Sequence, residues 1–166
     1  WINGQRFTET EQQGDYAAFA SAELDFWDQL TLRPGVRYSY NTAYNAPVTP
    51  SLNVKWGKDN WSIRGSYARG FRAPGLKELY FYFVDANHNI QGNEDLKAEQ
   101  SHSTALNIKW KRLKESRLFQ IEVGGFYNHL VNQITLAQIS GTEYSYVNVG
   151  TYKTTGGTMN FSGLVQ

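Results

Sequence analysis

The sequence predicts an all-β fold: an antiparallel transmembrane β-barrel segment of about seven strands, with one apolar and one polar face. Three observations support this prediction. Apolar and polar residues alternate with period two along most of the 166 residues. Tyr and Trp recur at the ends of the apolar stripes, as in the aromatic belts of membrane proteins. Short polar turns also alternate with long or irregular connections, as in barrels that cross a bilayer.

Seven segments carry the alternation, and they lie at residues 15–27, 30–40, 48–56, 61–69, 103–110, 119–134 and 156–165. In the first segment, one face carries Tyr16, Ala18, Ala20, Ala22, Leu24 and Phe26. The other face carries Asp15, Ser21, Glu23 and Asp25. The apolar stripe is unbroken and has an aromatic ring at each end. Such a stripe predicts a strand with one face in an apolar environment.

The later segments repeat the same asymmetry. The apolar sides carry Val36, Leu52, Val54, Trp56, Trp61, Ile63, Tyr67, Leu106, Ile108, Trp110, Ile121, Val123, Met159, Phe161 and Val165, among others. The polar sides carry charges in mid-strand, at Glu23, Arg37, Lys55, Arg64 and Lys109. Charges at these positions are typical of a barrel with a hydrated interior.

The connections fall into two classes. Short polar turns are expected at 28–29, 57–60 and 112–116, whereas long or irregular connections are expected at 71–99 and 137–146. Turns at one end and loops at the other are typical of outer-membrane barrels. A soluble antiparallel sandwich also alternates and has tight turns, so it stays open as an alternative. The aromatic residues at the stripe ends favour the barrel.

The composition fits a surface that is half apolar and half hydrated. Hydrophobic residues make up 40% of the chain and mean hydropathy is −0.55, yet aromatic residues reach 15%. No apolar run approaches the roughly 18 residues of a membrane helix, and no signal peptide opens the chain. The sequence begins abruptly at Trp1 and stops at Gln166 within a patterned segment. We therefore expect a piece of a longer protein.

Several function classes are disfavoured. Net charge is +1 with the basic residues spread along the chain, so no nucleic-acid partner is expected. The absence of cysteine excludes disulfides and thiolate metal sites. The acidic residues around Asp85, Glu94 and Asp95 lack the spacing of a calcium loop. No nucleophile elbow, H-E-x-x-H motif or P-loop is present, so we expect no metal site and no enzymatic activity.

The segment 71–99 breaks the alternation and carries distinctive motifs. FRAP at 71–74 is followed by LKELYF at 76–81 and by GNEDLKAE at 92–99. An unpaired excursion of about 29 residues is expected here, although most connections have about 4–6 residues.

These motifs resemble the conserved region of TonB-dependent outer-membrane receptors, in which FRAP ends a strand and an NPDLKPE-like box opens the next one. The segments 16–40 and 126–161 resemble other stretches of the same barrels. Two departures occur in the box, where Glu94 and Ala98 replace prolines. Losing two residues of fixed φ predicts a less rigid path into the strand.

The resemblance implies a location in the bacterial outer membrane and a barrel of about 22 strands around a separate plug domain. This chain would be a barrel fragment over 1–166, supplying about a third of that wall, with 71–99 as a long extracellular loop. Its partners would be outer-membrane lipid, the plug of the same receptor and, through the plug, TonB. Its polar face, with Glu23, Arg33, Arg37, Arg64 and Lys109, would hold the plug. A sheet with open edges would transport nothing by itself.

The implied function is import of an iron chelate, haem or cobalamin. A passive porin or adhesin-like barrel and a soluble carbohydrate-binding sandwich stay open as alternatives. No resident cofactor is implied, because haem or an iron chelate would be the transported ligand.

Within the family, a histidine between the two boxes resembles the loop histidine of haem receptors. His88 lies in that interval, with Tyr80 and Tyr82 nearby as possible stacking or axial partners. The candidate ligand-binding residues are therefore His88, Tyr80, Tyr82 and Arg72. Each has a plainer alternative. His88 can hydrogen-bond within its Asn-rich turn, the tyrosines can pack at the barrel rim, and Arg72 can fix the loop base through bidentate contacts.

Overall fold

The computed structural model describes residues 10–114 and 117–165, which form one sheet with little helix. The long strands are β1 (Asp15–Ser21), β3 (Leu30–Asn41), β4 (Thr49–Lys58), β5 (Trp61–Arg72), β8 (Glu99–Lys114), β9 (Arg117–Ser140) and β10 (Glu143–Val165). Three-residue strands are β2 (Leu24–Phe26), β6 (Tyr82–Val84) and β7 (Asn89–Gln91). The turn η1 (Trp27–Gln29) and the helix α1 (Leu76–Tyr80) complete the elements. The described part of the chain thus confirms the predicted number of long strands.

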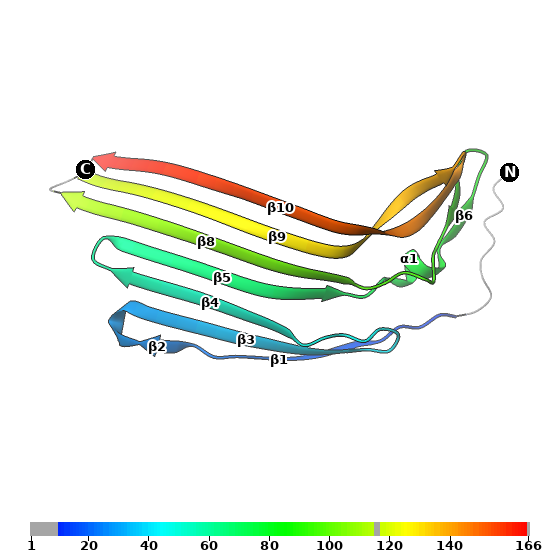
Figure 1. Cartoon of the computed structure of the whole chain (residues 1–166), viewed down its shortest axis with the longest axis horizontal. Helices are drawn as coiled ribbons and strands as arrows, with labels where there is room; N and C mark the ends of the chain where they lie inside the picture. Colours follow the sequence, from blue (N-terminus) through cyan, green and yellow to red (C-terminus); the bar gives the residue numbers. More distant parts are fainter. Residues whose placement is uncertain (1–9, 115–116, 166) are drawn as a thin grey trace.

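The strands form a single sheet in the order β1-β3-β4-β5-β8-β9-β10-β7-β6, with β2 paired to β3. The long strands are antiparallel and run side by side along the long axis of the molecule, in a sheet that curls along its length (Figure 1). Within the described residues, the edge of β10 that faces away from β9 is paired only at residues 143–145, where β7 lies parallel to it. The other outermost long strand is β1.

The register confirms that the sheet has two chemically different faces. Directly paired residues share a face, and one continuous row across five strands contains Trp56, Ile63, Ile108, Val123 and Met159. A row on the opposite face contains Lys55, Arg64 and Asn107. The alternation predicted from the sequence is therefore kept in register from strand to strand.

The apolar stripe is not covered by a second layer. Leu24, Val36 and Leu52 are 44%, 47% and 39% exposed. In a sandwich these side chains would be buried between two sheets, so the sandwich alternative is wrong for the described residues. A single layer that leaves apolar side chains uncovered needs another apolar phase on that side.

Packing is concentrated where the connection between β5 and β8 folds onto the sheet. Leu79, Leu96 and Ile134 are buried there, and Tyr44, Tyr80 and Tyr146 pack against them. Pro74 is fully buried at the same end. This small core holds a long connection in one conformation, whereas the long strands are held mainly by their ladders of hydrogen bonds.

The 71–99 segment is not the unpaired excursion that the sequence predicted. β5 continues to Arg72 and β8 begins at Glu99, so the connection spans residues 73–98. Within it, β6 and β7 form a small hairpin, and β7 pairs in parallel with residues 143–145 of β10. Asn89 and its partner Glu143 are 54 residues apart in the sequence, so no local sequence pattern predicts this pairing.

Two other connections also differ from the prediction. The 137–146 region is a continuous hairpin, because β9 runs to Ser140 and β10 resumes at Glu143. Gly141, with φ of 46°, permits this short turn. Residues 112–114 belong to β8, so most of the turn predicted at 112–116 is strand; residues 115 and 116 lie outside the described part of the chain.

The predicted turns at 28–29 and 57–60 are present, the second narrowed to Asp59 and Asn60. These turns lie at one end of the sheet, and the connections 42–48, 73–98 and 141–142 lie at the other (Figure 1). We call the second end the loop end. Among the described residues, no helix has the length and apolar character needed to cross a membrane.

Candidate ligand-binding site

Arg72 joins three elements at the loop end. Its Nε donates to Glu99 Oε2 at 2.7 Å, its Nη1 to Glu78 Oε2 at 2.8 Å and its Nη2 to Glu78 Oε1 at 3.1 Å. The guanidinium therefore ties the end of β5 to α1 and to the start of β8. A planar guanidinium has several N–H donors and can therefore bind two carboxylates at once. We call Arg72, Glu78 and Glu99 the loop clamp.

The helix α1 places Glu78 for this contact. Pro74 cannot donate a backbone hydrogen bond, and the chain turns into the helix directly after it at Gly75. The Gly75 N–H donates to Glu78 Oε2 at 2.7 Å, so the same carboxylate closes the first turn of the helix and accepts from Arg72. The FRAP motif thus sets both the strand end and the helix start.

The loop clamp lies at the loop end, where β5 ends and β8 begins, and beyond the rows that carry Ile63 and Tyr67. Burial opposes ionisation of Glu78, but its bonds from Arg72 and Gly75 outweigh this effect and lower its pKa. The Arg72 hydrogen bond, helped by the Ile134 N–H, lowers the pKa of Glu99 despite its burial. Both carboxylates also raise the pKa of Arg72. The clamp is therefore ionised at neutral pH.

Acidification is expected to loosen the loop clamp. Because the folded-state pKa values of Glu78 and Glu99 lie below the ordinary 4.5, their stabilisation is fully present above that pH. It is lost as pH falls through the lowered values. Amide exchange, corrected for intrinsic rate, should show falling protection at Gly75 and Ile134, whose N–H groups donate to these carboxylates. Val54 in mid-sheet is the control, and equal loss there would contradict a local effect.

The GNEDLKAE box is anchored by two asparagines. Asn93 Nδ2 donates to the Tyr146 carbonyl at 2.8 Å, and Asn148 Oδ1 accepts from the Lys97 N–H at 2.7 Å. Asn148 Nδ2 also donates to the carbonyls of Lys97 and Asn132. Leu96 is buried between these anchors, at 3% exposure. Side-chain hydrogen bonds and one buried leucine therefore fix the path of the segment that lacks the two prolines.

A cavity of about 680 Å³ lies beside α1 at the loop end. Its lining includes Leu76, Tyr80, Phe81, Tyr82, Asn93 and Glu94. The structure thus brings together Tyr80 and Tyr82, two of the residues that the sequence singled out. The lining combines aromatic rings and amide or phenol groups with the carboxylates of Glu11 and Glu94. Among its described residues there is no Lys, Arg or His. Such a wall can stack on and hydrogen-bond a planar or aryl-rich ligand.

His88 does not line this cavity. It lies in the exposed turn between β6 and β7, where its N–H and its Nδ1 contact Asp85 Oδ1 at 2.6 Å and 3.1 Å. Its ring lies 5.9 Å from that of Tyr144 on β10. The local hydrogen bonds expected for a histidine in this turn are present. They engage Nδ1, whereas Nε2 has no hydrogen bond in the described part of the chain.

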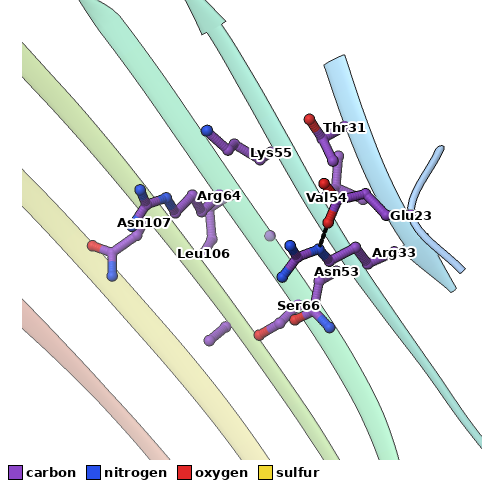
Figure 2. Close-up of a pocket in the computed structure, with 12 residues that line it drawn as sticks. Glu23, Thr31, Arg33, Asn53, Val54, Lys55, Arg64, Ser66, Leu106 and Asn107 are labelled. Atoms are coloured by element: carbon purple, nitrogen blue, oxygen red, sulfur yellow. Dashed lines mark hydrogen bonds and ion pairs between the residues drawn. The ribbon is translucent and has the colours of Figure 1, made fainter. Parts of the chain in front are cut away.

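A second hollow, of about 580 Å³, lies on the polar face (Figure 2). Arg33 and Glu23 contact each other directly there, and Lys55 and Arg64 line other parts of the hollow, from β4 and β5. The lining thus contains three cations and one carboxylate. Asn53 and Asn107, which the sequence reasoning did not single out, add amide groups. Their only signal in the sequence was the polar position in the alternation.

The remaining polar-face candidates lie outside this hollow. Arg37 donates from Nε to Ser39 Oγ at 3.1 Å, and Lys109 lies 4.0 Å from Glu122 on β9. Outside the hollow, Lys109 therefore has a carboxylate neighbour, whereas Arg37 donates to a hydroxyl group.

Comparison with known proteins decides the family. The family model described as "TonB dependent receptor-like, beta-barrel" matches residues 1–163. The chain belongs to this family. The family and the relatives below confirm the predicted fold class and the outer-membrane location.

Curated relatives carry names from both siderophore and haem biology. The chain is 28% identical over 109 residues to the ferrienterobactin receptor of Escherichia coli, covering 58% of this chain and 15% of the relative. It is 32% identical over 98 residues to an iron-regulated outer membrane virulence protein of Vibrio cholerae, covering 57% and 15%. It is 33% identical over 102 residues to hemoglobin and hemoglobin-haptoglobin-binding protein B of Haemophilus influenzae, covering 61% and 8%.

Solved structures show the same fold. The siderophore receptor PirA of Pseudomonas aeruginosa superposes with a TM-score of 0.74 at 18% identity, covering 90% of this chain and 31% of that one. A hemophore receptor of Serratia marcescens, solved with its hemophore and heme, gives a TM-score of 0.74 at 16% identity, covering 90% and 32%. The chain spans 15% of the length of the first curated relatives, so it corresponds to part of a receptor barrel.

Proposed function

We propose that this chain is part of the barrel of a TonB-dependent outer-membrane transporter that imports an iron chelate or haem. The observation that carries the proposal is the curled sheet itself, with uncovered apolar rows on one face and a hollow with unpaired cations on the other. The family match over residues 1–163 supports the proposal, because it is a match to a receptor β-barrel. The names of the relatives favour iron chelates or haem over cobalamin.

The polar hollow suits a plug domain as partner. Lys55 and Arg64 form no ion pair within the described residues, although both line the hollow that also contains Glu23. A plug segment with a carboxylate would complete their pairing in a site that membrane lipid does not reach. The apolar face would contact lipid, and TonB would act through the plug. A passive porin or adhesin-like barrel does not need such an ion pair. The family match does not favour either of these barrels.

The 71–99 loop would face the outside of the cell and make the first contact with the ligand. Tyr80 and Tyr82 would contact it in the cavity beside α1, and His88 would approach it from the β6–β7 turn. Imidazole and phenolate groups both ligate iron. Arg72 would position the loop, because all of its donor nitrogens already contact Glu78 and Glu99. We propose a binding and transport role with no catalytic step.

A haem titration of the full-length receptor tests the cargo and the role of His88. His88→Ala is expected to shift the Soret band and weaken haem binding by at least about tenfold, since even outer-shell partners of a metal ligand are worth about 10–100-fold. Asn87→Ala changes the next residue of the same exposed turn and should bind as wild type.

An unchanged spectrum and affinity would remove His88 from the site. If haem does not bind at all, ferric siderophores are the next ligands to titrate, with the Tyr80→Phe and Tyr82→Phe variants as probes of the cavity. The import role itself fails if iron-limited cells that lack the receptor grow as well as wild type on haem and on ferric siderophores.

A further inference from the structure

One row on the apolar face is basic. The register pairs Arg69 with His102, His102 with His129, and His129 with Lys153, so these residues form a continuous row across β5, β8, β9 and β10. We call it the basic row. The two histidine rings lie 6.5 Å apart, and Tyr67 Oη lies 2.9 Å from His102 Nδ1. The four side chains therefore form one patch, although they lie up to 84 residues apart in the sequence (153 minus 69).

The basic row lies at the boundary of the apolar stripe. One step toward the middle of the strands, the same face carries the row of Tyr67, Thr104, Tyr127 and Thr155. The next row holds Leu106 among three glycines, and the row after it holds Ile63, Ile108 and Val123. Tyrosine rings at the end of an apolar stripe mark the level of lipid headgroups, and long basic side chains reach the same level.

Within the described residues, the basic row has no counter-charge. Arg33, Arg72 and Lys109 all pair with carboxylates, and all three lie on the polar face. No ion pair among the described residues involves the basic row. Arg69 donates only to the side chain of Gln100, and its Nε has no partner in the described part of the chain. The carboxylates of β8 and β9 nearest to the row, Glu99 and Glu122, belong to the opposite face because side chains alternate.

We propose that the basic row binds the phosphate groups of lipid headgroups in the leaflet at the loop end. Arg69 and Lys153 supply permanent positive charge, and the two imidazoles between them supply ring N–H donors. Neighbouring strands are about 4.8 Å apart, so the row spans about 14 Å and reaches more than one phosphate. The proposal rests on the outer-membrane placement given under Proposed function and is independent of the cargo.

The test uses the full-length receptor in phosphatidylcholine nanodiscs that contain either lipid A or the same lipid A stripped of its phosphates. Retained lipid is measured by native mass spectrometry. The variant is Arg69→Gln with Lys153→Gln. The matched control is Lys58→Gln with Arg112→Gln, which removes two cations from the same face at the opposite end. A charge-preserving variant, Arg69→Lys with Lys153→Arg, tests whether charge is sufficient.

Each Lys or Arg near an anionic surface is worth about fivefold in affinity, so the variant is expected to retain phosphorylated lipid A about 25-fold less well. The control and the charge-preserving variant should retain it as wild type, and stripped lipid A should bind all four proteins equally. Equal retention by variant and wild type would overturn the proposal, as would an equal loss in the control. Full displacement by inorganic phosphate would assign the row to free anions instead of lipid. A receptor that does not partition into the membrane fraction would refute the proposed function itself, which separates the two failures.

Discussion

Arg72→Ala is expected to detach the 73–98 connection from the sheet while the long strands stay paired. The substitution leaves Glu78 and Glu99 close together without their shared cation, in side chains that are only 19% and 14% exposed. Removing one partner of a buried pair costs about 3–5 kcal/mol. Because the Arg72 side chain is 46% exposed, solvent screens part of this loss, and we expect about 2 kcal/mol for the local opening.

Hydrogen exchange of amides in 76–91 measures this opening. Arg33→Ala is the matched control, since Arg33 and Glu23 pair on the surface with side chains 63% and 45% exposed. Its cost should lie between zero and about 1 kcal/mol. Arg72→Lys is expected to fall between the two, because one ammonium cannot donate to two carboxylates in the geometry of a guanidinium. Wild-type exchange rates in Arg72→Ala would show that the buried core, and not the loop clamp, holds the connection.

Gly92→Ala is expected to separate the β6–β7 hairpin from α1. A Cβ atom at this position would lie 2.3 Å from the Leu79 carbonyl oxygen and 2.6 Å from the Tyr80 nitrogen. These are backbone atoms of a helix end whose Leu79 side chain is buried, so they cannot move aside as a flexible side chain would. Overpacking of this kind costs about 1–3 kcal/mol. The displaced segment also lines the cavity with Tyr80 and Tyr82, so ligand affinity should fall with it.

The control for this substitution is Gly65→Ala, at a mid-strand position where an added Cβ meets nothing within 4 Å. Limited proteolysis of the 73–98 connection should be faster in Gly92→Ala and unchanged in Gly65→Ala. Ligand affinity, measured by titration of the same two variants, is the second measurement. Equal protease resistance in both variants would contradict the tight approach of Gly92 to α1.

The long strands could be predicted because their signal is local. A strand repeats every two residues, and one face of each strand meets an apolar phase while the other meets water, so the pattern is visible within a single segment such as 61–69. The short elements gave no such signal. β7 has three residues and pairs with β10 through contacts distant in the sequence, and the hairpin at 137–146 depends on the backbone of Gly141.

For the candidate site, the sequence left two roles open for Arg72, ligand binding or fixing the loop base, and the structure supplied its two carboxylate partners. Sequence proximity also suggested that His88 would lie with Tyr80 and Tyr82. It does not, because Tyr80 and Tyr82 flank the start of the hairpin and His88 occupies its far turn. Although β6 and β7 have only three residues each, they place the turn with His88 outside the cavity lining.

By itself, the sequence determined which side of the sheet the residues of the seven patterned segments occupy and where the central part of each long strand lies, since both depend on the identity of near neighbours. Only the tertiary structure decided which residues of different strands stand side by side. The basic row and the loop clamp both arise from register, which is set by hydrogen bonds between segments far apart in the chain. A shift by a single residue would move every one of these side chains to the other face.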